Sequence, residues 1–279
     1  MSRLSLNTAT INRADLATAL DVTVKAGIPA VGLWRKPVQD VGLAEAAARV
    51  ADSGLRVSSL CRGGFFTAVA GPVRQAALDD NRRAIEETAT LAAAGAPGSA
   101  AVLVLVPGGL PPGDRDLPGA RERVAEAVAE LAPVAEAAGV TLALEPMHPI
   151  YAADRGVIST LGQALDIAEA VTGVGVVIDT FHVWWDPDLP RQIARAGRAG
   201  RIAGFQVGDW ITPFPADALL ARGLMGEGHI DFPAIVEQLD EAGYRGDIEV
   251  EIFRREIWDA DPRVVAERVV DAFRVAVEG

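Results

Sequence analysis

The feature that most constrains the fold of this chain is a regular alternation between short apolar runs and longer segments with helical spacing. Short apolar runs bounded by turn residues predict buried strands, and apolar residues three and four positions apart predict amphipathic helices. The expected strands are Leu4–Leu6, Ala30–Trp34, Leu55–Cys61, Ala101–Pro107, Val140–Glu145, Gly175–Asp179, Ile202–Val207 and Ile248–Ile252. The expected helices are Arg13–Ala26, Ala44–Ser53, Val73–Ala94, Gly119–Ala138, Leu161–Val171, Leu189–Gly197, Phe232–Ala242 and Pro262–Val277.

Eight consecutive strand-then-helix units predict an α/β protein that forms a closed parallel (β/α)8 TIM barrel, with residues 1–279 as a single domain. Asn12 is the expected N-cap of the first helix, and glycines that suit a left-handed cap follow four helices, at Gly27, Gly54, Gly139 and Gly243. An open doubly wound sheet is the alternative. The first turn, "LNTATIN", lacks the glycine pattern of that fold and of the common nucleotide-binding loops.

Charge and composition limit the partners of the chain. The formal net charge is −12, which disfavours nucleic acid and anionic membranes and leaves a small molecule as the expected partner. The single cysteine, Cys61, lies in the apolar run "LRVSSLC" and is expected to be buried rather than reactive. The sequence has no apolar stretch long enough for a membrane span and no signal-peptide pattern at its start, so we expect a cytoplasmic protein.

Polar side chains stand at the carboxyl ends of the last four expected strands. Glu145 ends the run "LALE", Asp179 ends "VVID", Gln206 lies in "AGFQVGD" with Asp209 just beyond it, and Glu251 lies in "IEVEIF". The carboxyl ends of barrel strands meet at one mouth, which is where the functional residues of such folds gather. We therefore expect these oxygen-bearing side chains to converge.

A shared divalent cation would explain this convergence. One acidic residue at a strand end is usually a cap or a loop anchor, but three carboxylates in a dry pocket repel one another and raise each other's pKa. A divalent ion removes the repulsion, and three carboxylates with one amide oxygen suit Mn²⁺, Mg²⁺ or Co²⁺ better than a structural zinc site. The predicted ligands are Glu145, Asp179, Gln206 and Glu251, with Mn²⁺ as the expected ion and Mg²⁺, Co²⁺ or Zn²⁺ as alternatives.

These stretches resemble the xylose isomerase-like TIM barrel superfamily and, within it, the sugar phosphate isomerase/epimerase group. The resemblance covers the whole chain and is most specific in "LALEPMHP", "GVVIDTFHVWWDP", "FQVGDW" and "GLMGEGHIDFPAIVEQLDEAGYRGDIEVEIF". Glu145, Glu251 and the D-x-x-H pair of Asp179 and His182 fit the family pattern. Gln206 stands where the family commonly has a histidine. In this respect the chain is similar to some relatives that dehydrate 3-dehydroshikimate, which use glutamine there.

The resemblance implies a metal-dependent isomerase or epimerase of a sugar, keto-sugar or inosose. Such enzymes remove a proton next to a carbonyl and pass through a metal-stabilised enediolate. By similarity to ketose 3-epimerases, Glu145 and Glu251 are the expected acid–base pair, and His182 is the expected contact to a substrate oxygen. The family also implies a homodimer or homotetramer.

Further residues near the predicted mouth are candidates for contacting substrate, because aromatic faces stack on sugar rings and polar side chains bind their hydroxyls. These candidates are Trp34, Arg62, Phe66, His148, Trp184, Trp185, Asp209 and Trp210. Packing against the barrel rim is the simpler interpretation of any single aromatic residue, and a solvated side chain is the simpler interpretation of Arg62 and Arg222. His229 is expected in a surface loop. No phosphate-binding glycine run is present, so the family name does not by itself predict a phosphorylated substrate.

Three other functions stay open at this point. A lyase acting on a 3-dehydroshikimate-like keto-polyol would begin with the same proton abstraction, and Gln206 favours it slightly. A phosphodiesterase resembling endonuclease IV would need several metal-binding histidines and a basic face, which three histidines and a charge of −12 oppose. A non-catalytic barrel subunit predicts loss of the metal site.

Overall fold

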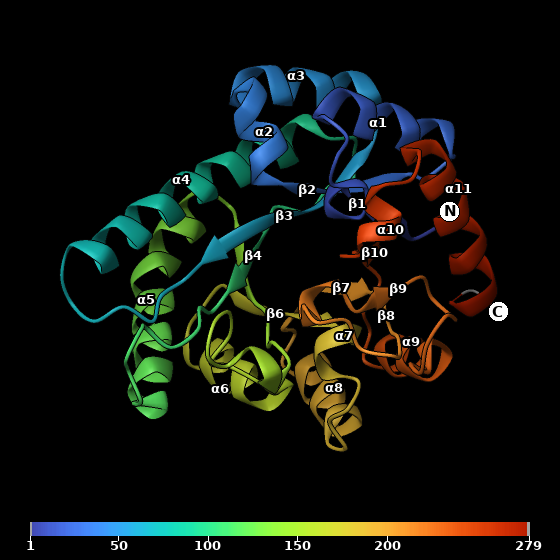
Figure 1. Cartoon of the computed structure of the whole chain (residues 1–279). Coiled ribbons are helices and arrows are strands. Elements are labelled where there is room, and N and C mark those ends of the chain that lie inside the picture. The colour runs from blue at the N-terminus through green and yellow to red at the C-terminus, as the bar shows by residue number, and fades with distance from the viewer. Residues whose placement is uncertain (1, 278–279) are drawn as a thin grey trace.

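The computed structural model describes residues 2–277 and contains a closed barrel of eight parallel strands, which confirms the expected fold class. Around the barrel the strands follow the order β1, β10, β7, β6, β5, β4, β3, β2, and helices surround them on the outside (Figure 1). The barrel strands are β1 (Leu4–Asn7), β2 (Ala30–Trp34), β3 (Arg56–Gly64), β4 (Val102–Val106), β5 (Thr141–Leu144), β6 (Val174–Asp179), β7 (Ile202–Val207) and β10 (Ile248–Val250).

Eight of the helices correspond to the expected ones: α1 (Leu16–Lys25), α3 (Leu43–Ser53), α4 (Pro72–Ala94), α5 (Leu117–Ala137), α6 (Leu161–Ala170), α8 (Leu189–Arg198), α9 (Phe232–Glu241) and α11 (Pro262–Ala276). Three short helices were not expected: α2 (Arg35–Val41), α7 (Thr180–Val183) and α10 (Arg255–Trp258). Short 3₁₀ turns occur at η1 (Thr8–Ile11), η2 (Pro149–Tyr151) and η3 (Ala218–Leu220). None of the helices within residues 2–277 has the length and apolar character that crossing a membrane requires.

The start of the first helix differs from the prediction. Residues Thr8–Ile11 form the turn η1, so the α-helix begins only at Leu16, and Asp15 rather than Asn12 is its N-cap. The Asp15 side chain accepts a hydrogen bond from the backbone N–H of Thr18 at 2.8 Å, as an N-cap carboxylate should.

Strand β3 runs three residues further than expected, through Gly63 and Gly64. A Cβ atom on Gly64 would lie 1.8 Å from the carbonyl oxygen of Val106 in β4, and Gly64 has a φ of +112°. Only glycine therefore lets β3 and β4 approach so closely at the mouth of the barrel. This extension carries Arg62 and Phe65 up to the rim.

A polar layer fills the barrel interior below the mouth, centred on the buried carboxylate of Glu249. One carboxylate oxygen accepts hydrogen bonds from Asn7 at 2.6 Å and Gln206 at 2.8 Å, and the other accepts from Ser58 at 2.6 Å and Ser59 at 2.8 Å. Four donors compensate the cost of burying this charge. Glu249 lies two residues before Glu251 in the chain and was not among the predicted polar residues.

A short antiparallel ribbon crosses the mouth beyond β7. It consists of β8 (Asp209–Trp210) and β9 (Arg222–Gly223), which pair with each other rather than with the barrel. The ribbon brings Arg222, from the middle of a long loop, next to the ends of the barrel strands.

Candidate metal centre and active site

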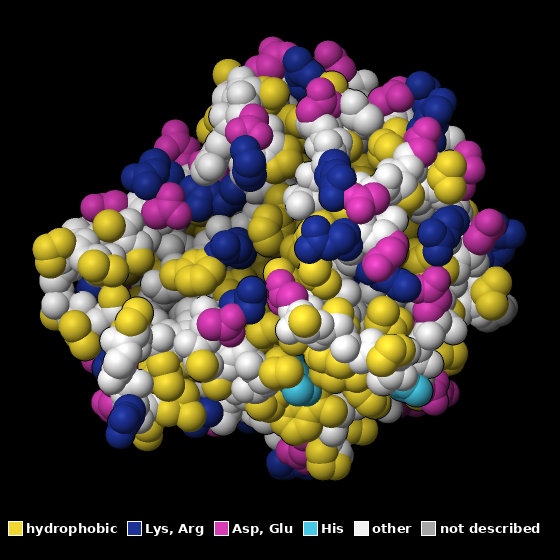
Figure 2. Space-filling view, viewed as in Figure 1, with side chains coloured by type: hydrophobic (Ala, Val, Ile, Leu, Met, Phe, Trp, Pro, Cys, Tyr) yellow, Lys and Arg dark blue, Asp and Glu magenta, His cyan; other side chains and the backbone are white. Residues whose placement is uncertain are grey.

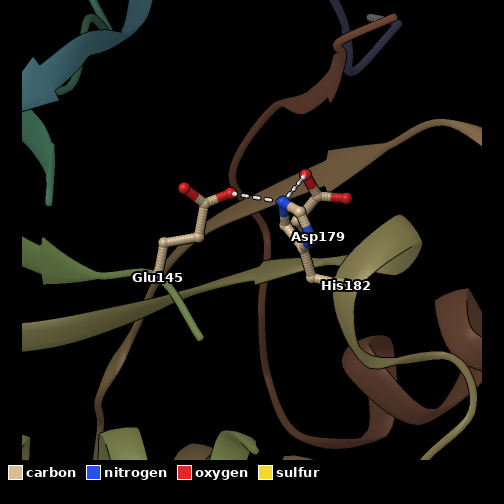
Figure 3. A group of neighbouring side chains, drawn as sticks. All are labelled: Glu145, Asp179 and His182. Carbon is tan, nitrogen blue, oxygen red and sulfur yellow. Dashed lines mark ion pairs between the residues drawn. The ribbon is translucent and has the colours of Figure 1, made fainter. Parts of the chain in front are cut away.

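Three buried carboxylates and one histidine converge at the carboxyl ends of the strands. Glu145 directly follows β5, Asp179 ends β6, His182 lies in α7 and Glu251 directly follows β10. The Nε2 atom of His182 lies 3.8 Å from a Glu145 oxygen and 3.9 Å from a carboxylate oxygen of Asp179 (Figure 3). All four side chains are at most 6% exposed. Glu145 and Asp179, from two different strands, thus lie beside the same histidine ring, and the strand-end pattern had predicted that these two acids converge.

Arg222 is the cation of this group, although a solvated side chain was the simpler expectation for it. Its side chain is 2% exposed, and its Nη1 atom lies 2.8 Å from Oδ2 of Asp179 and 3.4 Å from Oε2 of Glu251. Nη1 also donates a hydrogen bond to the backbone carbonyl of Glu251 at 3.0 Å. The pairing of β8 with β9 positions this guanidinium at the site. The local sequence "LLARGLM" contains no signal that predicts this position.

The ring of His182 lies between two donors. The backbone N–H of His148 faces Nδ1 at 3.3 Å, and Nη2 of Arg222 faces Nε2 at 3.1 Å. Burial, and then the positive charge of Arg222, hold the pKa of His182 well below its usual value. The imidazole is therefore neutral near pH 7 and has one proton to place between its two nitrogens.

Without a bound cation, burial and mutual repulsion disfavour the charged forms of the three carboxylates. Burial, followed by the neighbouring charges of Asp179 and Glu251, raises the pKa of Glu145 well above its usual value. Burial also raises the pKa of Glu251, to about 7, and that of Asp179, although Arg222 opposes the shift at both residues. Burial alone would lower the pKa of Arg222, but the charges of Asp179 and Glu251 outweigh it and raise that pKa.

A cavity of about 460 Å³ opens onto this group from the barrel mouth, which is a size that suits a small ligand. Glu145, His182, Arg222 and Glu251 line its floor. Its remaining walls come from Trp34, Cys61, Arg62, Phe65, Val104, Val106, Met147, Asp154, Arg155, Leu219, Phe253 and Trp258. Of the predicted substrate contacts, Trp34 and Arg62 line the cavity. Phe253, Trp258, Asp154 and Arg155 were not predicted.

The structure places several other predicted substrate contacts outside the walls of this cavity. Phe66 is 1% exposed and packs in the core, whereas the preceding residue, Phe65, lines the cavity. Four further candidates, namely His148, Trp184, Trp185 and Trp210, are not among the cavity-lining residues. Instead they pack together: the ring of Trp210 lies 4.9 Å from that of His148 and 5.6 Å from that of Trp184. This arrangement agrees with packing at the rim, and a role of these four residues in binding substrate stays a prediction.

Two further expectations concern single residues outside the cavity floor. Cys61 is buried, as expected, and burial, followed by the charge of Glu251, raises the pKa of its thiol well above the usual value. His229 lies in an exposed loop, also as expected, with Nε2 at 3.2 Å from the hydroxyl of Thr212.

Comparison with known proteins now places the chain in a family. Residues 20–274 match the family model described as the xylose isomerase-like TIM barrel. The chain belongs to this family. Among curated relatives, the L-ribulose 3-epimerase of Mesorhizobium japonicum is 33% identical over 140 residues, which is 49% of this chain and 42% of that protein. The inosose isomerase of Bacillus velezensis is 30% identical over 159 residues, which is 55% of this chain and 53% of that protein.

These alignments span only about half the length of the curated relatives. A solved Sinorhizobium meliloti protein is similar throughout, with 47% identity, a TM-score of 0.93 and coverage of 99% of this chain and 98% of that one. The IolI protein, solved with a bound zinc atom, has the same fold, with a TM-score of 0.83, 22% identity and coverage of 100% of this chain and 98% of that one.

The xylose isomerase-like family implies a divalent cation, and the residues present here fit one. Glu145, Asp179 and His182 each offer a ligand atom, and these atoms lie within 4.8 Å of one another. Within residues 2–277, Arg222 is the only lysine or arginine at ion-pair distance from the three buried acids, so the group carries an excess of negative charge. Oδ2 of Asp179 has no hydrogen-bond partner, although Arg222 lies close by. A buried carboxylate oxygen that has only an ion-pair contact can also bind a cation.

Gln206 is the predicted ligand that the structure does not bring into this group. Its Nε2 atom donates to Glu249 at 2.8 Å, in the polar layer below the mouth, and approaches Cys61 at 3.7 Å. Its Oε1 atom is buried without a hydrogen-bond partner among the described residues. Its role as a ligand stays a prediction.

Asp209 was expected to contact substrate, but it holds the loop that follows Arg222. It is fully buried, and its two carboxylate oxygens accept four backbone N–H groups, from Trp210 at 2.8 Å, Gly226 at 2.9 Å, Gly228 at 2.7 Å and Ile230 at 3.1 Å. The carboxylate has no capacity left for a substrate hydroxyl. The D of the motif Q-x-x-D thus fixes the far end of the segment that carries Arg222.

We expect Asp209→Asn to destabilise the protein by about 2–4 kcal/mol, because the new amide NH₂ would face backbone donors in place of an acceptor. Chemical denaturation monitored by tryptophan fluorescence measures the loss. Asp217→Asn is the matched control, since Asp217 is exposed and caps only the turn η3, and it should cost less than about 1 kcal/mol. Equal losses for the two variants would contradict this assignment.

The raised pKa of Glu251 predicts how stability depends on pH. Because the folded-state pKa of about 7 lies above the usual 4.5, protonated Glu251 favours the folded state, and that contribution is lost as pH rises through about 7. The chelator-treated protein should therefore lose stability relative to Glu251→Gln between about pH 5.5 and about pH 8. Denaturation of both proteins at the two pH values measures this difference. An increase in the stability of the wild-type protein relative to Glu251→Gln over this pH range would contradict the prediction.

Proposed function

We propose that this protein is a divalent-metal-dependent isomerase or epimerase of a sugar, keto-sugar or inosose. The observation that carries the proposal is the convergence of Glu145, Asp179, His182 and Glu251 beneath a cavity of about 460 Å³. The curated relatives, an L-ribulose 3-epimerase and inosose isomerases, act on small polyhydroxy compounds according to their names, which supports the same substrate class here.

Glu145, Asp179 and Glu251 would hold the cation, with Gln206 as the predicted fourth ligand. When bound, the ion would supply positive charge to the carbonyl and the adjacent hydroxyl oxygen of the substrate. Mn²⁺ fits the oxygen-rich donor set, and Mg²⁺, Co²⁺ and Zn²⁺ are the alternatives.

Glu145 and Glu251 are the residues proposed to move the proton. They follow β5 and β10, which are separated in the barrel by β6 and β7, so the two carboxylates reach the cavity from different sides. One carboxylate removes the proton next to the carbonyl, and the other returns a proton to the opposite face or to the neighbouring carbon. Trp34 donates its indole N–H to Oε1 of Glu251 at 3.0 Å, which fixes the orientation of that carboxylate.

His182 and Arg222 are proposed to hold the oxygen atoms of the reacting carbons. Both line the cavity floor, and both present N–H groups that can donate to an oxygen as it gains negative charge. The neutral state of His182 matters because it can keep one N–H for the substrate without adding charge to the site.

Incubation of the Mn²⁺-loaded protein with ketoses and inososes in D₂O tests the proposal. Deuterium entering one carbon of a substrate, without loss of water, supports an isomerase or epimerase. Deuterium exchange with loss of water from a 3-dehydroshikimate-like substrate would instead favour the lyase. The lyase is the second candidate because Gln206 stands where the family commonly has a histidine. No exchange with any compound, together with no binding of Mn²⁺ by calorimetry, would favour a non-catalytic barrel. The single-domain organisation, cytoplasmic location and dimeric or tetrameric state remain predictions.

A further inference from the structure

Arg62 occupies an unusual position in the wall of the active-site cavity. It follows buried Cys61 near the end of β3, and its guanidinium lies over the ring of Phe65 at 4.2 Å and near the ring of Trp34 at 5.8 Å. Within residues 2–277 it makes no hydrogen bond and no ion pair. Burial lowers the pKa of this guanidinium, but arginine remains charged at any physiological pH.

The other basic groups of the cavity already have partners. Arg222 contacts Asp179 and Glu251, and Arg155 pairs with its neighbour Asp154. Figure 2 shows basic side chains, in dark blue, interspersed with acidic ones around the centre of the face that carries α7, α10 and β8 in Figure 1. Arg62 is thus the cavity-lining cation that has no hydrogen-bond or ion-pair partner among residues 2–277.

The support beneath Arg62 is held in an uncommon backbone conformation. Phe65 has a φ of +63°, in the left-handed region that non-glycine residues rarely adopt, and its side chain is 40% exposed. Its backbone N–H donates to the carbonyl of Val106 at 2.8 Å, which fixes the turn after Gly64. Strain of this kind persists where the surrounding structure imposes it, and it is common at ligand sites. Here its effect is to place the face of the Phe65 ring next to the guanidinium of Arg62.

A guanidinium held against aromatic rings, without polar partners, keeps N–H donors free for a ligand. Aromatic contacts occupy its faces, whereas hydrogen bonds to an acid form in its plane. A carboxylate matches that edge with two parallel N–H···O bonds, and such charge-assisted pairs are stronger than bonds to neutral hydroxyls.

We propose that the cavity recognises a polyhydroxy substrate that carries a carboxylate, and that Arg62 binds this group. The inference deepens the proposed function and rests on it. A single negative charge is the one that fits: with a divalent ion among Glu145, Asp179 and Glu251, and with Arg222 beside them, the cavity floor is neutral. Arg62 then adds one positive charge, which a ligand with one negative charge would neutralise. The two negative charges of a phosphate would exceed this positive charge, and no second unpaired cation lines the cavity within residues 2–277.

Binding of three compounds that differ at one end only tests this inference. Fructose, fructuronate and fructose 6-phosphate share the ketose end and differ by a hydroxymethyl, a carboxylate and a phosphate group. Isothermal titration of the chelator-treated and the Mn²⁺-loaded protein should show fructuronate binding at least about 10-fold more tightly than fructose, because a charge-assisted bond contributes about that much. Arg62→Gln should remove the preference, and Arg62→Lys should keep part of it.

Arg155→Gln is the matched control, because it removes a cation from the same cavity that is already paired with Asp154, and it should keep the preference for fructuronate. Binding of fructuronate no tighter than that of fructose, including no binding of either, would overturn the inference. So would a preference for fructose 6-phosphate that depends on Arg62. Deuterium exchange into a neutral ketose together with no carboxylate preference would overturn this inference while leaving the proposed function intact. A carboxylate preference with no deuterium exchange into any compound would support this inference and contradict the proposed function.

Discussion

Glu145→Gln and Glu251→Gln should each reduce deuterium exchange into the substrate by about 100-fold to about 10,000-fold, the usual contribution of a positioned acid or base. Glutamine keeps the size of the side chain and one oxygen, but it cannot accept and return a proton. Exchange measured by NMR in D₂O at saturating Mn²⁺ separates this loss from a simple loss of the ion. Single-turnover measurements should show the same reduction, because the proton transfer itself is affected.

Glu249→Gln is the control for removing a buried carboxylate from the barrel. Glu249 is as deeply buried as Glu251, but it lies in the polar layer below the mouth and does not line the active-site cavity. We expect it to cost stability while exchange per folded molecule falls by less than about 10-fold. Full activity in either Glu145→Gln or Glu251→Gln would show that the acid–base assignment is wrong.

Arg222→Met should destabilise the chelator-treated protein by about 3–5 kcal/mol, because removing one partner of a buried ion pair leaves charges with no compensation. Asp179 loses its nearest cation, at 2.8 Å, and Glu251 loses a second contact at 3.4 Å. Added Mn²⁺ should restore part of the loss, since a divalent ion neutralises the same carboxylates. Denaturant unfolding with and without Mn²⁺ measures both effects.

Arg222→Lys is the matched control for charge. It keeps the positive charge but cannot contact Asp179, Glu251 and His182 at once, so its loss should be clearly smaller than that of Arg222→Met. A loss below about 1 kcal/mol for Arg222→Met would mean that the acids are protonated and do not depend on this guanidinium. The proposed electrostatic balance of the site would then have to be abandoned.

The fold was predictable from the sequence because its elements are each encoded locally. Eight apolar runs and the helices between them carry their own periodicity, and their boundaries were predicted to within a few residues. The acids at the strand ends were predictable for the same reason, since the barrel brings the ends of parallel strands together whatever the loops do. Glu145, Asp179 and Glu251 needed no knowledge of the loops.

What the sequence could not provide depends on the loops and on backbone direction. Arg222 reaches the site only because β8 and β9 pair and Asp209 fixes the segment beyond, which is a tertiary arrangement. Phe65 lines the cavity in place of Phe66 because Gly64 and the left-handed Phe65 turn the chain, and a one-residue change of direction reverses which ring faces inward. Gln206 lies on a strand as predicted, but the buried Glu249 beside it competes for its amide.

The pairing of β1 with both β2 and β10 has a consequence for biosynthesis. Strand β1 is synthesised before β10, so the edge of β1 that pairs with β10 stays unpaired until the chain between them and β10 itself have been added. Glu145 and Asp179 emerge long before Glu251 can join them. The proposed ion site is therefore complete only after β10 has been synthesised, and nascent chains that stall before β10 should depend on chaperones rather than on metal for protection.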